Sequence, residues 1–350
     1  MHKPITPPEY KIDDATLPAI KAHKNTSKNR IIYIDLLKGL AIIGVVFVHA
    51  PGHPDWWVPN NVNLIFFFLS GIFFKQEPIK ELVKRRWDMI FVPFLFFYLL
   101  SYPFRLMVGY WDNRDLGLLR WDMILDVFKV TPAGDYLSVN VALWFLPCLF
   151  LTGIIYLCIS HLPKQAQILL FLFIMLFSDE ICNKFPTPLF INNAIYYTIF
   201  FGVGSLLGKK IIRYCEHLNE RLIVLFTSII AMIAFHLLTN LELHHRLVEI
   251  FDSLYWLAYC VAALAIFSFL NECKKLSWLE YLGVNSLIVL GCHMLVLYTI
   301  SRGFMKFHIP ETAATAIVQT ILCVLIMFPS IWFFNRYCPR FIGKRYAKKT

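Results

Sequence analysis

The chain has little charge for its length. Only 16% of its 350 residues are charged, whereas 58% are hydrophobic. Soluble domains carry about a quarter charged residues, and a helix that crosses a bilayer needs about 20 predominantly apolar residues. Six stretches have that length: 31–50, 88–108, 221–239, 250–270, 281–301 and 312–335. The sequence therefore predicts an integral membrane protein.

Two further kinds of signal are missing. None of the nine cysteines shows the C-x-x-C spacing of a zinc or redox site, and the adjacent His244 and His245 are a weak metal signal, so no metal site is expected. Residues 1–30 are polar and lack the short apolar core of a cleaved signal peptide. We expect these residues to form a disordered cytoplasmic tail.

Four further apolar stretches complete the predicted fold, an all-α polytopic transmembrane helical bundle of about ten helices. They are 60–74, 142–160, 166–181 and 193–212, of which the first and third are short. The membrane domain is expected over 31–335 and a basic cytoplasmic tail over 336–350.

Basic residues indicate how the bundle is oriented. With a cytoplasmic N-terminus, 24 of the 33 Lys and Arg residues fall in inner segments and eight in outer segments or their flanks. This bias predicts that both termini are cytoplasmic. It also explains the net charge of +10 through topology and contact with the lipid bilayer, so no nucleic acid partner is expected. The longest connection, 109–141, would be extracytoplasmic. Its mixed aromatics and carboxylates suit sugar binding, and equally suit an interfacial loop.

Ionisable side chains within apolar spans are costly and point to function. In the first helix, Lys38 and His49 are 11 residues apart, which places them about 20° apart around the helix. Asp35 lies within ion-pairing reach of Lys38. The alternative is that Asp35 and Lys38 extend to the inner interface and His49 ends the helix before Pro51. An imidazole at this position could take a proton from a hydroxyl.

Two later segments carry similar candidates. Lys84, Arg85 and Arg86 begin the third span, where guanidinium groups could hold phosphates or act only as topology signals. Ser286 and His293 are seven residues apart and share a helix face. For His293, the alternative is a neutral imidazole that is hydrogen-bonded to a helix carbonyl.

Five stretches also carry a family likeness: 34–39 leading to His49, 66–74 with Ser70, 84–86 leading to Pro93, 143–147 with Trp144, and 283–287 with Asn285 leading to His293. At these residues the chain resembles the integral-membrane acyltransferases of the acyltransferase three group, which O-acetylate surface polysaccharides and related glycans. Two positions depart from that pattern. Lys38 stands where many members have Arg, and Ile90 stands where a second Arg is frequent.

The resemblance implies a donor, an acceptor and a location. The donor substrate would be cytoplasmic acyl-CoA, usually acetyl-CoA, with no permanently bound cofactor. The acceptor would be a hydroxyl of an extracytoplasmic glycan or sugar, modified at a bacterial-type inner membrane. His49 would act as general base, or as a nucleophile that forms an acyl-histidine. The implied catalytic residues are His49, Asp35 and His293, and the implied substrate-binding residues are Lys38, Arg85, Arg86, Ser70, Asn285, Ser286 and Trp144.

Other functions fit parts of the same pattern. A multi-pass transporter or flippase of a glycan or small polar solute would also contain buried charges, but the spans show no inverted repeat. A glycan polymerase or ligase normally has a large outer loop rich in Arg, whereas 109–141 is more acidic than basic. A non-catalytic membrane receptor is the third alternative. Neither the acceptor nor the oligomeric state can be read from the sequence.

Overall fold

The computed structural model describes residues 31–344, apart from 55–57, 59–60, 114–124, 126–127, 129–136, 138, 185–186, 242 and 271–273. Its main helices are α2 (Ile32–Val48), α3 (Leu64–Ile72), α4 (Ile79–Arg86), α5 (Val92–Asn113), α6 (Phe145–Ile159), α7 (Lys164–Leu176), α8 (Ile191–Tyr214), α9 (Leu218–Thr239), α10 (His245–Ser268), α11 (Ser277–Val284), α12 (Ser286–Lys306) and α13 (Ala313–Tyr337). Short π and 3-10 segments join some of them, and the described residues contain no β-strand. The all-α prediction is confirmed.

Among the described residues, seven helical segments are long and apolar enough to cross a membrane. They are Ile79–Met107, Val141–Ile159, Pro188–Tyr214, Leu218–Thr239, His245–Ser268, Ser286–Lys306 and Ala313–Tyr337. These helices make the chain a multi-pass membrane protein. The other three predicted spans contain α2, α3 and α7, which have 17, 9 and 13 residues. Ten crossings and cytoplasmic termini therefore stay predictions.

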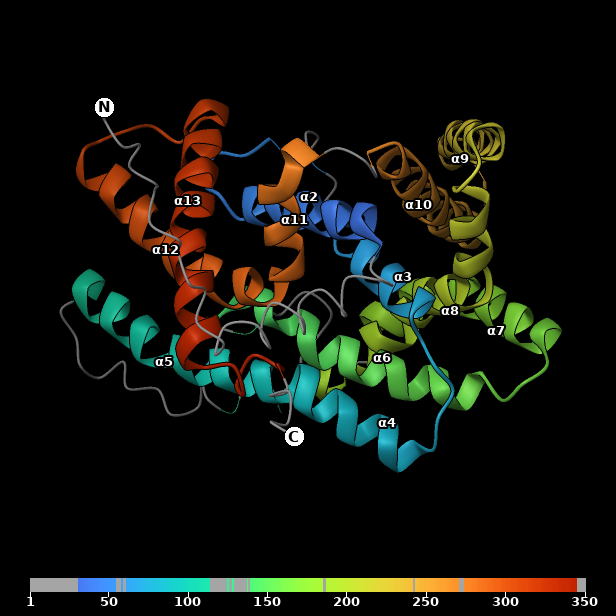
Figure 1. The fold of residues 1–350 in the computed structure, drawn as a ribbon, viewed down its shortest axis with the longest axis horizontal. Helices are drawn as coiled ribbons and strands as arrows, with labels where there is room; N and C mark the ends of the chain where they lie inside the picture. The colour runs from blue at the N-terminus through green and yellow to red at the C-terminus, as the bar shows by residue number, and fades with distance from the viewer. Residues whose placement is uncertain are drawn as a thin grey trace, which may run out of the picture. The chain divides into compact units, whose positions relative to one another are not determined.

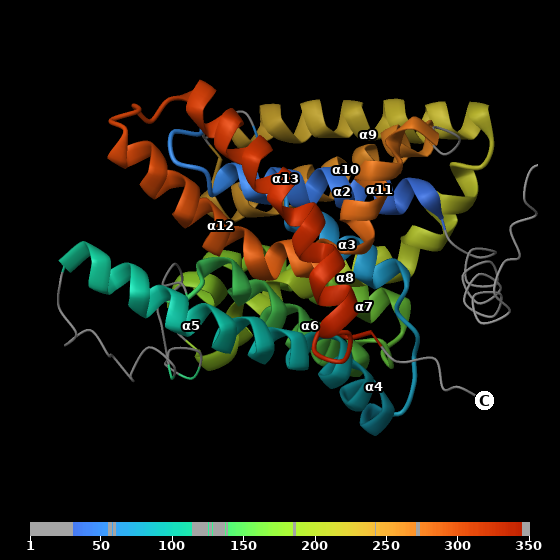
Figure 2. The ribbon, with the colours of Figure 1, turned by 60° about the vertical axis from the view of Figure 1, so that its left-hand side comes forward.

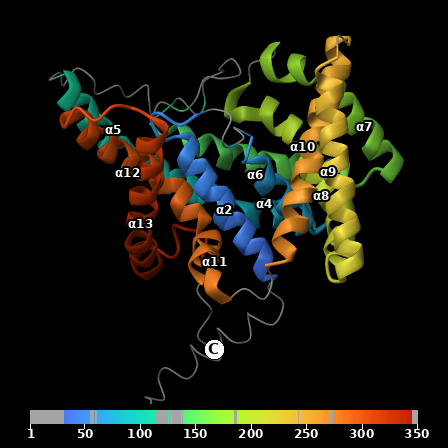
Figure 3. The same ribbon diagram turned by 90° about the horizontal axis from the view of Figure 1, so that it is seen from above.

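The helices of the unit that starts at Tyr33 pack around α2. Figures 1 and 3 show α9 and α10 side by side on one flank of α2, and α12 and α13 on the other. Figure 2 shows α4 and α5 following one another along a further side. Of the polar side chains of α2, Tyr33 and Asp35 are buried and Lys38 is half-buried.

A π-helical turn, Trp87–Phe91, joins α4 to α5. Pro93 has no backbone N–H and its ring conflicts with the carbonyl four residues earlier. The wider turn removes that conflict, and the N–H of Val92 bonds to the carbonyl of Trp87. The long segment therefore continues through a proline while α4 carries Arg85 and Arg86 at its end.

The predicted span 281–301 is not one continuous helix. It breaks at Asn285, whose φ and ψ of −108° and 20° separate α11 from α12. The side-chain Nδ2 of Asn285 donates to the carbonyl of Tyr281 at 2.8 Å. An asparagine can satisfy a helix carbonyl in this way, so it offers the backbone an alternative to continuing the helix.

Two glycines bring α2 and α11 into backbone contact. A Cβ added at Gly39 would overlap the carbonyl oxygen of Leu279, and one added at Gly283 would overlap the carbonyl oxygen of Asp35. Each glycine therefore faces the backbone of the opposite helix. Small residues allow this close approach between membrane helices, and the approach fixes how α2 is rotated.

The chain beyond α13 folds back on the bundle. Phe341 stacks on Phe96 of α5 with ring centroids 5.1 Å apart, and the Nζ of Lys344 donates to Asn285 at 3.0 Å and to Asn335 at 2.6 Å. Part of the predicted tail 336–350 is thus packed. The predicted tail 1–30, and residues 345–350, lie outside the described residues.

We expect Gly283→Ala to destabilise the folded protein, because its methyl group would meet the backbone of α2 and not a side chain that can rotate away. Overpacking of this kind costs about 1–3 kcal/mol. The matched control is Gly303→Ala in α12, where an added Cβ has no neighbour within 4 Å and helix propensity favours alanine. Thermal unfolding in detergent, followed by loss of monodisperse protein, measures both. Equal unfolding temperatures for the two variants would contradict the glycine contact.

Candidate active site

A cavity of about 810 Å³ lies among α2, α3, α4, α6 and α12. Seven of the ten residues predicted for the site line it: Lys38, His49, Ser70, Arg85, Arg86, Trp144 and Ser286. They come from parts of the sequence as distant as α2 and α12. The fold thus brings most of the predicted site into one space.

The α2 helix supplies Lys38 and His49 to this cavity. Both side chains are half-buried and line it, as their spacing predicts. His49 follows the last residue of the helix, and its backbone N–H bonds to the carbonyl of Val46 at 3.3 Å. Eleven residues of helix correspond to about 16 Å, so the two side chains line parts of the cavity that are well separated along α2.

His293 of α12 lies directly behind His49. The two ring centroids are 5.4 Å apart with an angle of 32° between the planes. His293 is fully buried and does not line the cavity. Its Nδ1 lies 2.9 Å from the carbonyl oxygen of Val289 and 3.0 Å from that of Leu290. The predicted alternative, an imidazole hydrogen-bonded to a helix carbonyl, therefore holds for the Nδ1 of His293. Its ring also lies beside the ring of His49.

Arg86 presents a buried cation to the cavity. Its side chain is 8% exposed, its Nη1 donates to the carbonyl of Leu149 at 3.0 Å, and its Cζ lies 5.3 Å from the ring centroid of Phe201. A Cβ at Gly153 would overlap the guanidinium, so this glycine makes the room it occupies. The Nε has no hydrogen-bond partner among the described residues. Burying a cation with unused donors is costly, and an anion in the cavity would offset that cost.

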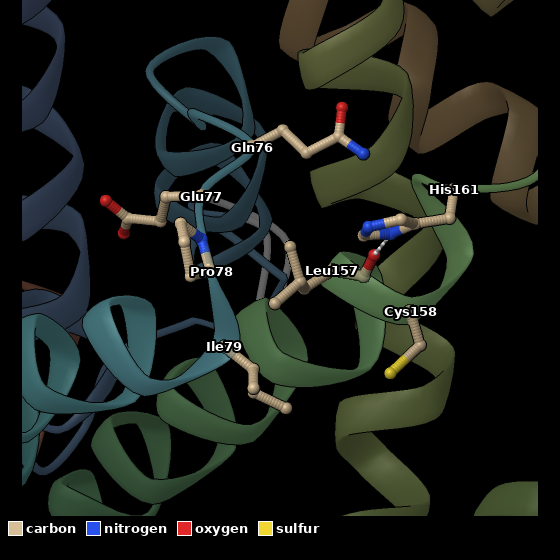
Figure 4. A pocket seen from close by; sticks show the side chains of 7 residues that line it. All are labelled: Gln76, Glu77, Pro78, Ile79, Leu157, Cys158 and His161. Atoms are coloured by element: carbon tan, nitrogen blue, oxygen red, sulfur yellow. Dashed lines mark hydrogen bonds between the residues drawn. The ribbon is translucent and has the colours of Figure 1, made fainter.

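Arg85 has a different environment. Its guanidinium is paired with Glu77, with Nη2 and Nε at 2.6 and 2.8 Å from the same carboxylate oxygen. Glu77 lines a second cavity of about 630 Å³, between the start of α4 and the end of α6. Figure 4 shows its carboxylate turned away from His161 and Cys158 on the opposite wall. An anion that reached Arg85 would therefore have to compete with Glu77.

Aromatic rings form another wall of the cavity. The ring of Trp144 lies 5.8 Å from Tyr197 and 6.1 Å from Phe190, and Tyr197 stacks on Phe67 at 4.3 Å. Both Trp144 and Tyr197 line the cavity. Leu189 and Phe190 have φ of 58° and 60°, a left-handed conformation that costs free energy for residues other than glycine. This strained turn sets Phe190 against Trp144.

A family model described as an acyltransferase domain matches residues 31–336. The chain belongs to this acyltransferase family. No curated protein and no solved structure matches the chain. The part of the chain that the structure describes contains seven helices of membrane length. Together with these helices, the match makes the protein a membrane acyltransferase, and it confirms the family expected from the sequence.

Besides His293, two further predicted site residues of the acyltransferase lie outside the cavity. Asp35 is 7% exposed and its Oδ1 is 3.5 Å from the Nζ of Lys38, but it is separated from His49 by about 20 Å of helix. Asn285 is 4% exposed and contacts Tyr281, Asn335 and Lys344. Asp35 therefore holds Lys38, and Asn285 shapes the α11–α12 break.

Sequence reasoning missed several cavity residues. Asn61 and Asn63, just before α3, bring amide groups to the lining, and Tyr197 brings a phenol. The two asparagines precede an apolar run, which was a usable signal. Tyr197 was one aromatic among many and had none. Most of the connection proposed for sugar binding, 114–124 and 129–136, lies outside the described residues.

We expect the two neighbouring histidines to differ in their accessibility to reagents. Diethyl pyrocarbonate that enters the cavity from solution should modify His49, which lines the cavity. It should leave the fully buried His293 unmodified in the folded protein. Peptide mass spectrometry after a short exposure measures both sites. Unfolded protein is the control, in which both should react. Equal modification of the two residues in folded protein would contradict the cavity's boundary.

Proposed function

We propose that this membrane acyltransferase transfers an acyl group, typically acetyl, from cytoplasmic acyl-CoA to a hydroxyl of an extracytoplasmic glycan or sugar. One observation carries the proposal: basic side chains and His49 line a single cavity. Phosphates of the donor suit the basic part, and a reacting carbonyl suits the imidazole. The family match supports acyl transfer.

The directions of α2 and α6 support a donor that approaches from the cytoplasm and an acceptor that approaches from the outside. With a cytoplasmic N-terminus, α2 runs outward from Lys38 to His49, and α6 runs inward from Trp144 at its start to Gly153 beside Arg86. The cationic residues then lie toward the cytoplasm, and His49 and Trp144 toward the outside. We infer that acyl-CoA places its phosphates near Arg86 and extends its pantetheine arm along α2.

The chemistry assigned to His49 is general base catalysis. Its imidazole takes the proton of the acceptor hydroxyl while the oxygen attacks the thioester carbonyl. The carbon–sulfur bond then breaks, the new carbon–oxygen bond remains, and the imidazolium returns the proton to the leaving thiolate. A covalent route, in which His49 is acylated first, uses the same residue and the same cavity.

The acceptor is assigned to the aromatic end of the cavity. Trp144 and Tyr197 offer ring faces, and the amides of Asn61 and Asn63 offer hydrogen bonds to hydroxyl groups. Ser70 and Ser286 add hydroxyls to the lining. An inner-membrane location and cytoplasmic termini belong to the same proposal, because acyl-CoA is cytoplasmic.

We expect His49→Ala to lower acyl transfer by about 10²–10⁴-fold, the usual contribution of a positioned acid–base group, with binding of acetyl-CoA changed little. Purified protein and ¹⁴C-acetyl-CoA measure binding, and the acetyl content of surface glycans from cells that carry each variant measures transfer. His236→Ala is the control, since His236 is exposed on α9. Full transfer by His49→Ala would refute the assigned role. Export of an unmodified solute without any binding of acetyl-CoA would favour the transporter.

Arg86 and Glu77 should change donor binding in opposite directions. Arg86→Lys keeps the charge but loses the planar fork, and the loss of a charged hydrogen bond, about 1.5–3 kcal/mol, predicts a Kd for acetyl-CoA about 10–100-fold higher. Glu77→Gln releases Arg85 from its carboxylate and should lower the Kd. Equilibrium binding of ¹⁴C-acetyl-CoA measures both, with dephosphorylated CoA as the control ligand. An unchanged Kd for Arg86→Lys would contradict the phosphate assignment.

A further inference from the structure

The tautomer of His293 follows from its hydrogen bonds. Its Nδ1 lies within bonding distance of two carbonyl oxygens, those of Val289 at 2.9 Å and Leu290 at 3.0 Å. Carbonyl oxygens only accept hydrogen bonds, so Nδ1 must carry the proton. In a neutral imidazole the other nitrogen, Nε2, then has a free lone pair and can only accept.

That accepting nitrogen is buried and has no partner among the described residues. His293 is 0% exposed, and an unsatisfied buried acceptor is uncommon in a folded protein. The ring of His49 is the polar neighbour in reach, with centroids 5.4 Å apart and planes inclined by 32°. Nε2 accepts no hydrogen bond from His49 in this arrangement. Because imidazole nitrogens lie on the edge of the ring, a rotation of the neighbouring His49 ring would bring one of its N–H groups toward this lone pair.

The segment that carries His293 is held from three sides. The Nδ2 of Asn140 donates to the carbonyl of Gly291 at 3.2 Å, the Sγ of Cys323 lies 3.8 Å from the carbonyl of His293 itself, and the ring of Phe97 fills the space beside Gly291. A ring fixed on a helix that is itself fixed can set the orientation of a neighbour.

We propose that His293 is a positioning residue for His49. In the catalytically active arrangement the ring of His49 turns an N–H to this Nε2, so that the proton of neutral His49 stays on the nitrogen away from the cavity and the cavity-facing nitrogen keeps its lone pair. This inference rests on the proposed function of His49. In catalysis the hydroxyl proton goes to the cavity-facing nitrogen of His49 and then to the leaving thiolate, while His293 keeps its own proton throughout.

In this arrangement the imidazole of His293 orients the catalytic histidine and fixes its tautomer, which a carboxylate does in many acid–base sites. Asp35, the acid of the same helix, is too far along α2 to contact His49. A neutral acceptor also avoids placing a second charge in the membrane interior, where charge is costly.

Two substitutions distinguish the role of His293 as a hydrogen-bond acceptor from its role in filling the interior. His293→Asn keeps a donor near the carbonyls of Val289 and Leu290 but is too short to reach His49, whereas His293→Gln can bring an accepting oxygen close to the position of Nε2. We expect His293→Asn to lower kcat by about 10–100-fold, as loss of an orienting partner commonly does, with KM for acetyl-CoA within about twofold of the wild type. His293→Gln should recover most of kcat.

A spectroscopic measurement tests the same point without depending on how a His293 variant folds. In ¹⁵N-histidine-labelled wild-type protein, with the His49 signals assigned by their loss in His49→Gln, the two ring nitrogens should report one tautomer. A mixture of tautomers in the wild type, or wild-type kcat in folded His293→Asn, would overturn the positioning role. The proposed function fails separately, when His49→Ala itself remains active.

Discussion

The contact between α2 and α11 decides which residues can reach the cavity. At this crossing Gly39 and Gly283 each face a backbone carbonyl of the other helix, and any side chain there would separate the two. The contact fixes the rotation of α2, which turns Lys38 and His49 toward the cavity and Asp35 away from it. It also places the break at Asn285 beside α2, from where α12 brings His293 to His49.

The two neighbouring arginines at the end of α4, Arg85 and Arg86, are buried to different extents and have different partners. Arg86 is held by a carbonyl and an aromatic ring, which orient it without neutralising it. Arg85, one residue earlier, is neutralised by Glu77. Adjacent cations on one helix therefore differ in what they can offer an anion. The buried Arg86 keeps its capacity for binding an anion, and the half-buried Arg85 is already paired.

Much of this was predictable from the sequence, because helix positions and helix faces depend on local periodicity. Seven of the ten spans, the cavity-facing placement of both Lys38 and His49, and the family were all predicted from the sequence. Asp35 shows the limit: an i, i+3 spacing explains its contact with Lys38 but not which of the two faces the cavity. The pairing of Arg85 with Glu77 depends on the path of a loop. The contact of His49 with His293 joins residues 244 positions apart, and only the tertiary packing of α2 on α12 brings them together.

The shortness of α3 has a physical consequence for the surrounding lipid. Its nine residues cover about 14 Å, roughly half of a hydrocarbon core of about 30 Å. The chain on either side, at Asn61, Asn63, Phe73 and Phe74, lines the cavity in non-helical or helix-terminal backbone. Such backbone is tolerated at membrane depth only where protein buries it or water reaches it. In the predicted ten-span arrangement, the low-dielectric barrier between the two compartments would therefore be thinner here than in the surrounding lipid, and a polar group inside the protein would cross only part of a bilayer.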